Sequence, residues 1–214
     1  LVATFPFTED RKRETVIVRA AGGVLAVTLA VTKGAPETIV ALCAEGSADL
    51  LQWRAQVEVL ARSGHKVIAV ARRELTESEW AGGEPDRGFR LAGLVALEDP
   101  VRAGVPEAIA ECRAAGIHVL MVTGDHPATA AAIAAEVGLG TGPPRVILGA
   151  ELQERLESNP DGGLRDIDVV ARAVPGEKLA LVRALQSAGE TVAVTGDGVN
   201  DVPALQAADI GIAM

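Results

Sequence analysis

The stretch VAVTGDGVND, residues 192–201, joins an apolar run to a loop that holds two aspartates, two glycines and an asparagine. An earlier stretch, VLMVTGDHPATA at 119–130, carries a similar apolar run into the same Thr-Gly-Asp tripeptide. A short apolar run followed at once by turn residues is typical of a buried strand that ends in a loop. The two stretches therefore predict two buried strands, each of which delivers an aspartate to a loop.

Strand and helix patterns alternate around these stretches, from residue 89 onward. RLAGLVALED predicts a strand, VPEAIAECRAAG a helix closed by Gly116, IHVLMVTG a strand, and PATAAAIAAEVG a helix that begins at Pro127 and ends at Gly138. After a polar, glycine-rich excursion around ESNPDGG, the order is DVVAR (strand), GEKLALVRALQSAG (helix), TVAVTG (strand), PALQAAD (short helix) and IGIAM (strand). Such alternation predicts an α/β fold with a doubly wound parallel sheet.

Residues 1–88 have a different pattern. The β-branched runs TVIV and LAVTLAVT flank a glycine turn at Gly22 and Gly23, and mixed helix and strand patterns follow. We therefore expect a small α+β unit at 1–88, followed by the doubly wound domain at 89–214.

Composition excludes several classes of protein. The chain has 214 residues, 49% of them hydrophobic, so it can bury a sizeable core. Its net charge of −9, without a run rich in Lys and Arg, argues against nucleic acid as the main partner. Cys43 and Cys112 lack metal-ligand spacing, which predicts a reducing compartment and no zinc site. No apolar run approaches the ~18 residues of a spanning helix, so we expect this chain to be soluble.

The predicted topology brings the polar loops together. Ligands bind outside the carboxyl ends of the strands in open α/β sheets, and right-handed crossovers place both loops at one edge. Thr123 and Asp125 leave one strand, and Asp197, Asn200 and Asp201 leave another. Gathered carboxylates repel one another unless a cation is present, so this set predicts Mg²⁺ bound together with a substrate phosphate.

Further groups fit the same chemistry. Lys178 opens the preceding helix and would supply a point charge to the phosphate, and Thr123 would add a hydroxyl group. The alternative for a single Thr-Gly-Asp is ordinary turn chemistry, and Asp201, close to Pro203, could simply cap a helix. Two matched occurrences, and three polar side chains in one short loop, favour metal or phosphate chemistry.

These residues resemble a known family. TGDGVNDVPALQAADIGIAM is similar to the hinge signature of P-type cation-transporting ATPases, whose phosphorylation domain belongs to the haloacid dehalogenase-like superfamily. FPFTEDRKRETVIV and KGAPE resemble the nucleotide-binding domain of that family, and LEDPVR, MVTGD and ARAVPGEK resemble its phosphorylation domain. The first pair points to the type II group of calcium, sodium/potassium and related pumps.

The resemblance implies roles for matching positions. Phe7 would stack on adenine, and three cations would line the nucleotide pocket: Lys12, Lys33 and Lys66. Other residues would contact nucleotide or phosphate: Asp99, Arg102, Thr123, Gly124, Asp125, Arg172 and Lys178. Asp197 and Asp201 would hold Mg²⁺, with Asn200 hydrogen-bonding nearby. Glu9 stands where several relatives carry an arginine, which predicts weak ATP binding.

The nucleophile of that family, an aspartate in Asp-Lys-Thr-Gly-Thr, is absent from the sequence. Asp99 follows a predicted strand, but Pro100 and Val101 do not match the expected neighbours. We therefore expect a soluble fragment from the cytoplasmic part of an integral membrane pump, inactive alone, that supports phosphoryl transfer from ATP to an aspartate outside this chain. The alternatives are a soluble haloacid dehalogenase-like phosphatase and a nucleotide-binding module without turnover. The transported cation cannot be read from these residues.

Overall fold

The computed structural model describes residues 1–20, 27–43, 49–76, 80–158 and 164–214. The chain forms two compact units. Unit 1 consists of Leu1–Ala61 and His65–Glu98, and unit 2 consists of Asp99–Met214 together with Arg62–Gly64. Each unit has its own sheet structure and its own hydrophobic core.

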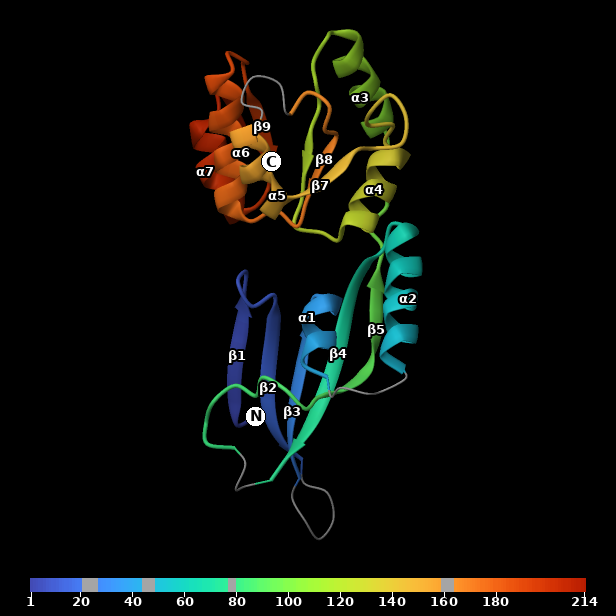
Figure 1. Cartoon of the computed structure of the whole chain (residues 1–214), viewed down its shortest axis with the longest axis vertical. Helices are drawn as coiled ribbons and strands as arrows, with labels where there is room; N and C mark the ends of the chain where they lie inside the picture. The colour runs from blue at the N-terminus through green and yellow to red at the C-terminus, as the bar shows by residue number, and fades with distance from the viewer. Residues whose placement is uncertain (21–26, 44–48, 77–79, 159–163) are drawn as a thin grey trace. The chain divides into compact units, whose positions relative to one another are not determined.

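Unit 1 is built on an antiparallel sheet with strand order β1-β2-β3-β4-β5 (Figure 1). Its strands are β1 (Ala3–Thr8), β2 (Arg13–Ala20), β3 (Val27–Gly34), β4 (Lys66–Leu75) and β5 (Arg90–Leu97). Helices α1 (Pro36–Ala41) and α2 (Asp49–Arg62) lie between β3 and β4 in the chain. The predicted hairpin is confirmed by the antiparallel pairing of β2 with β3, although its turn at Gly22 and Gly23 lies outside the described residues.

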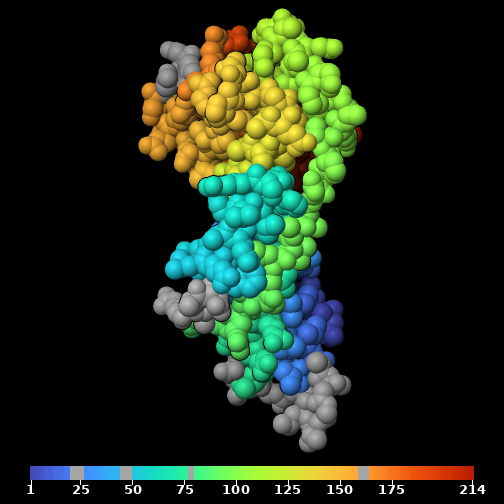
Figure 2. All heavy atoms as spheres, turned by 90° about the vertical axis from the view of Figure 1, so that its right-hand side faces the viewer, coloured from blue at the N-terminus to red at the C-terminus, as the bar shows by residue number. Residues whose placement is uncertain are grey.

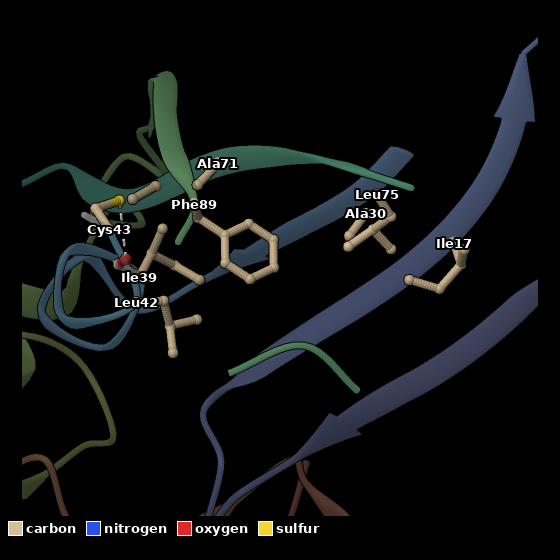
Figure 3. Close-up of a cluster of buried hydrophobic side chains, with 9 residues drawn as sticks. Ile17, Ala30, Ile39, Leu42, Cys43, Ala71, Leu75 and Phe89 are labelled. Carbon is tan, nitrogen blue, oxygen red and sulfur yellow. Dashed lines mark hydrogen bonds between the residues drawn. The ribbon is translucent and has the colours of Figure 1, made fainter. Parts of the chain in front are cut away.

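The core of unit 1 lies on one face of this sheet. Alternate residues of β2, β3 and β4 point to that face, where α1 and the residues after it pack against them. Figure 3 shows the Phe89 ring directed into the cluster, and the Cys43 thiol donates to the Ile39 carbonyl at 3.3 Å. Burial raises the pKa of Cys43, although a backbone hydrogen bond from Leu91 partly opposes it. The cysteine is therefore a core residue and not a reactive thiol.

Helix α2 lies at the surface of unit 1 (cyan in Figure 2). Val57 and Ala61 on one side of the helix are buried, while Leu51 and Val59 on the other side are 75% and 67% exposed. This distribution is that of an amphipathic helix packed on one side only.

The boundary between the units falls between Glu98 and Asp99, and not between residues 88 and 89. The strand predicted from RLAGLVALED exists as β5, but it pairs antiparallel with β4, from Lys66↔Leu97 to Arg72↔Arg90. A strand pattern in the sequence does not say which sheet the strand joins, because that choice depends on a partner far away in the chain.

Unit 2 is an α/β structure in which every paired strand is parallel to its partner. One sheet has the order β6-β8-β7, formed by Met121–Val122, Val169–Ala171 and Val146–Leu148. A second sheet pairs β9 (Ala193–Gly196) with β10 (Ile210–Ala213). The helices are α3 (Val105–Ala114), α4 (Pro127–Glu136), α5 (Gly149–Ser158), α6 (Pro175–Ser187) and α7 (Val202–Ala207), with a 3₁₀ helix η1 (Val199–Asp201).

Helices cover both faces of the β6-β8-β7 sheet. Val169 and Ala171 of β8 pack with α3 and α4, while Val170, between them, packs with α5 and α6. Opposite directions for successive side chains of a strand explain why β8 is apolar at every position. Local signals set the helix ends as predicted: Pro127 is the first residue of α4, and Gly116 and Gly138 have φ of 78° and 69° after α3 and α4.

The doubly wound α/β fold is confirmed, but its sheet is in two parts among the described residues. Helix α6 nonetheless packs against both parts: Leu181 contacts the cluster under β8, Val182 contacts the cluster under β9, and Leu185 lies in both. The predicted strand IHVLMVTG is reduced to Met121–Val122. Strand β7 and helix α5 were not predicted, because a strand of three residues that runs straight into a helix gives little periodic signal.

Candidate functional site

The first Thr-Gly-Asp loop continues directly from β6. The Thr123 amide donates to the Val170 carbonyl at 2.9 Å, so the parallel pairing extends into the loop. The Thr123 hydroxyl lies 3.2 Å from Oδ2 of Asp125 and accepts the Asp125 amide at 3.1 Å. These bonds close the loop on itself and hold the Asp125 carboxylate beside the hydroxyl.

Arg172, immediately after β8, is hydrogen-bonded to this loop through its backbone and its side chain. Its φ is 55°, an uncommon conformation for a residue with a side chain. Its amide donates to the Asp125 carbonyl at 3.2 Å, and Nη1 donates to the Gly124 carbonyl at 3.0 Å. The next amide, that of Ala173, donates to the Thr123 carbonyl at 2.9 Å. Arg172 and Ala173 thus fix the backbone of all three residues of the loop.

The second loop, which follows β9, is shaped around the Asp201 carboxylate. The Asp201 amide donates to the Gly198 carbonyl at 3.0 Å, and the Gly198 amide donates to Oδ2 of Asp201 at 3.2 Å. A Cβ on Gly196 would lie 2.7 Å from the Asp201 Cβ, and one on Gly198 would lie 3.2 Å from its Oδ2. The glycines of the motif therefore provide the space that the carboxylate occupies, while Asp197 and Asn200 are exposed.

Lys178 connects the start of α6 to the second loop. Its Nζ lies 2.6 Å from Oδ1 of Asp201, and the two side chains are only 21% and 16% exposed. Glu177, one residue earlier, accepts the Val174 amide at 2.8 Å and so caps the helix that carries the lysine. Charge-assisted bonds of this length, partly shielded from water, are strong and directional.

The lysine also sets the protonation of its partner. The hydrogen bond from Lys178 lowers the pKa of Asp201, burial opposes it, and the lysine charge and the Gly198 amide lower it further. Asp201 is therefore an anion throughout the physiological pH range.

The segment from Arg172 to Lys178 touches both loops, because Ala173 bonds to Thr123 and Lys178 bonds to Asp201. Predicted residues from three parts of the sequence are thus brought together, as the topology suggested. Glu177, Gly196 and Gly198 were missed as supporting residues. A glutamate three residues after Val174, just before an apolar run, was the available signal for Glu177.

The residues predicted to stack on adenine or to line the nucleotide pocket lie in unit 1. Phe7, on β1, is 57% exposed, and Lys12, in the β1–β2 turn, has a φ of 50°. The Lys33 ammonium lies 3.2 Å from Glu14, with side chains 61% and 34% exposed. Lys33 pairs with Val70, which lies four residues after Lys66 on β4, so Lys33 and Lys66 lie on the same face of the sheet. That face is opposite to the one that packs against the core.

Asp99 and Arg102 are exposed and lie between β5 and α3. Residues 99 and 100 have no regular secondary structure, and the Arg102 carbonyl accepts the Val105 amide at 3.2 Å before the helix begins.

The donor set of the second loop fits magnesium. Mg²⁺ is commonly held by one or two carboxylates, with water and substrate phosphate completing its shell, and Asp197 and Asp201 offer two carboxylates from one short loop. Across the described ranges, no cluster of three or more His, Cys, Asp or Glu side chains is placed to hold a metal. Of the helices described, none has the length and apolar character needed to cross a membrane.

Comparison with known proteins gives consistent results. A family model described as haloacid dehalogenase-like hydrolase matches residues 17–209. The chain is 38% identical to "Calcium-transporting ATPase 4, plasma membrane-type" of Arabidopsis thaliana, over 98% of the chain and 21% of that protein. It is 37% identical to "Calcium-transporting ATPase" of Bacillus subtilis, over 100% of the chain and 25% of that protein.

A third relative, "Probable cation-transporting ATPase F" of Mycobacterium tuberculosis, is 41% identical over 100% of the chain and 25% of that protein. The chain therefore spans between a fifth and a quarter of the length of these curated relatives.

Proposed function

Because the chain belongs to the haloacid dehalogenase-like hydrolase family, we propose that it is the cytoplasmic ATP-handling part of a cation pump. In this proposal unit 1 binds ATP, and unit 2 supports transfer of the ATP γ-phosphoryl group to an aspartate that lies outside these 214 residues. Relatives named as calcium-transporting and cation-transporting ATPases, similar along the whole chain, support it.

The observation that carries the proposal is the joining of both Thr-Gly-Asp loops by one short segment, Arg172 to Lys178. Ala173 holds Thr123 through a 2.9 Å hydrogen bond, and Lys178 holds Asp201 at 2.6 Å. A cation, a hydroxyl group and carboxylates are thereby held on rigid elements. Phosphoryl transfer depends mainly on such positioning and on charge stabilisation.

Each residue has a defined task in this proposal. The Lys178 ammonium, already held by Asp201, neutralises charge on the phosphoryl oxygens, and the Thr123 hydroxyl donates a hydrogen bond to one of them. Arg172 keeps the loop of Thr123 in place through the Gly124 carbonyl. In the structure the Thr123 hydroxyl donates its one proton to Asp125 at 3.2 Å, so it would exchange this acceptor for the phosphoryl oxygen when substrate binds. Asp197 and Asp201 would hold Mg²⁺, which supplies charge neutralisation when bound.

The packing of unit 2 suggests where the acceptor aspartate would enter. Within the described residues β6 pairs with β8 alone and β9 pairs with β10 alone, so each has one unpaired edge. Helix α6 packs across both sheets, because Leu185 belongs to the clusters under β8 and β9. A parallel strand between β6 and β9 would satisfy both edges and would end beside Thr123 and Lys178.

The test measures phosphorylation from ATP labelled on the γ-phosphate, in the presence of Mg²⁺. The intact pump is expected to form an acid-stable aspartyl-phosphate, and Lys178→Ala is expected to lower its amount by at least tenfold. The 214-residue chain is expected to remain unlabelled and to hydrolyse no small phosphomonoester. Labelling of the short chain that Asp99→Asn abolishes would instead identify a self-contained enzyme with Asp99 as its nucleophile.

A further inference from the structure

A glutamate far along the chain holds the turn that joins β1 to β2. Glu84 lies in the segment between β4 and β5. Its Oε1 accepts a hydrogen bond from Arg13 Nε at 3.1 Å, across 71 residues of sequence, and its Oε2 is paired with Arg11 Nη1. One carboxylate thus clamps two guanidinium groups that flank a single residue, Lys12.

This contact is shielded from solvent. The side chains of Glu84 and Arg13 are 13% and 14% exposed, and that of Arg11 is 30% exposed. Burial raises the pKa of Glu84, but hydrogen bonds from Arg13, Thr15 and Arg11, together with the Arg13 charge, lower it overall. A charged carboxylate is retained in a partly buried position only when it is well paired, so the clamp is an ordered part of unit 1.

The clamped turn carries groups of the proposed nucleotide site at both ends. Arg11 Nη2 donates to the Pro6 carbonyl, and Arg11 Nε donates to the Thr8 hydroxyl at 3.1 Å, so the arginine braces the residues on both sides of Phe7. Lys12 has its amide bonded to the Thr8 carbonyl at 2.8 Å. The distance between the aromatic ring and the ammonium group therefore depends on this turn.

The turn is also fitted to the strand that follows. The Lys12 carbonyl accepts the Ala35 amide at 3.0 Å, and a Cβ on Gly34 would lie only 2.3 Å from that carbonyl oxygen. Lys33, one residue earlier, is the third group of the proposed site. Displacement of the turn would thus change the relative positions of Phe7, Lys12 and Lys33.

We propose that Glu84 is a positioning residue of the nucleotide site, which fixes the β1–β2 turn through Arg11 and Arg13 so that Phe7 and Lys12 can engage one ATP molecule. The inference rests on the proposed function, since it assumes that ATP binds these residues. A positioning role for Glu84 predicts the opposite change in ATP affinity from the one that electrostatics alone predicts. Removing a negative charge beside three cations should strengthen ATP binding, whereas loss of a clamp should weaken it.

The first experiment uses that difference in sign. Binding of a fluorescent nucleotide, trinitrophenyl-ATP, is measured for the 214-residue chain, for Glu84→Gln and for a control, Glu190→Gln. The control removes a carboxylate paired with an arginine in unit 2, where Glu190 contacts Arg165. Glu84→Gln is expected to weaken binding about fivefold, and Glu190→Gln to leave it unchanged. Unchanged or tighter binding in Glu84→Gln would overturn the inference.

A double-mutant cycle separates positioning from general damage. If Glu84 acts through Lys12, then Glu84→Gln is expected to have little further effect on affinity in a Lys12→Gln background. Full additivity of the two losses would contradict action through Lys12. Glu84→Asp keeps the charge but shortens the reach, so weaker binding is expected here too, by about twofold, and it serves if Glu84→Gln does not fold.

Hydrogen exchange tests whether Glu84 holds the β1–β2 turn, and it does so without nucleotide. Exchange of the Lys12 and Ala35 amides, measured by NMR, is expected to accelerate at least fivefold in Glu84→Gln, with amides of the β3–β4 pairing unchanged. Equal protection of those two amides in both proteins would sink the positioning role. If instead nucleotide binding survives both Phe7→Ala and Lys12→Gln, then the proposed nucleotide site of unit 1 fails, whatever the exchange of the two amides shows.

Discussion

Thr123–Asp125 and Thr195–Asp197 share one tripeptide. The first follows β6, whereas the second begins with the last two residues of β9, and their surroundings differ. In the first loop, the threonine hydroxyl and the aspartate bond to each other, and a Cβ on Gly124 would lie at an ordinary 3.7 Å from the Ala173 carbonyl. In the second loop, a Cβ on Gly196 would lie 2.7 Å from Asp201, whose carboxylate is held by Lys178. The same tripeptide forms a turn closed by its own hydrogen bonds in the first loop, and in the second loop it surrounds the Asp201 carboxylate.

The largest expected effect is on stability, and it appears when the alanine substitutions of Gly196 and Gly124 are compared. Gly196→Ala is expected to lower the free energy of unfolding of unit 2 by about 3 kcal/mol, because the new methyl group overlaps the Asp201 side chain. Gly124→Ala is expected to change it by less than about 1 kcal/mol, since its site has room. Both tryptophans, Trp53 and Trp80, lie in unit 1, so urea unfolding of unit 2 is followed by NMR. Equal losses in the two variants would show that the loops are packed alike.

The second prediction concerns the stability of unit 2 at low pH. The Lys178 hydrogen bond lowers the pKa of Asp201 in the folded state. The contribution of the Asp201 carboxylate to the free energy of unfolding is therefore complete above the pKa of the unfolded state, and it is lost as the pH falls through the pKa of the folded state. Asp201→Asn is therefore expected to cost about 1.5 kcal/mol at pH 7. Its difference from wild type should shrink below about pH 3.9. Urea unfolding from pH 7 to 3 measures it, and a difference at pH 3 as large as that at pH 7 would assign the loss to packing.

Magnesium sharpens the contrast between the loops. If Asp197 and Asp201 hold Mg²⁺, then Mg²⁺ with a phosphate mimic at ten times its Kd should stabilise unit 2 by about 1.4 kcal/mol. Asp197→Asn should remove most of this gain, whereas Asp125→Asn, in the first loop, should keep most of it. Thermal melts with and without Mg²⁺ provide the measurement. An equal shift in wild type and Asp197→Asn would remove the metal assignment.

The smallest effect is expected in unit 1. Lys33 and Glu14 form an exposed ion pair, so Lys33→Ala should change stability by less than about 0.5 kcal/mol. We expect ATP binding by this chain to be weak or undetectable, and Lys33→Ala should weaken any binding further. Calorimetry measures both proteins under the same salt conditions. Tight binding that survives Lys33→Ala would place the nucleotide pocket elsewhere.

Local signals in the sequence were sufficient for much of unit 2. Pro127 and Gly138 mark the start and the end of α4. The apolar runs before the Thr-Gly-Asp loops form β6 and β9. These elements could be predicted because they depend on residues close together in the chain. The same signals failed for β7, which has three residues, and for the sheet that β5 joins. In both cases the deciding interactions come from strands that are distant in sequence.

The residues alone established an α/β fold, two aspartate-bearing loops at strand ends, and a resemblance to a pump family, since periodicity and motif spacing are properties of the linear chain. Folding decided which partners meet. Asp201 contacts Lys178 across 23 residues, and Glu84 reaches Arg11 across 73, and neither pairing has a local signal. The order of the sheets was likewise settled by packing, because α6 must bury Leu181 and Val182 under two different sheets at once. Such contacts arise from burial and charge pairing among distant residues, which composition and spacing leave open.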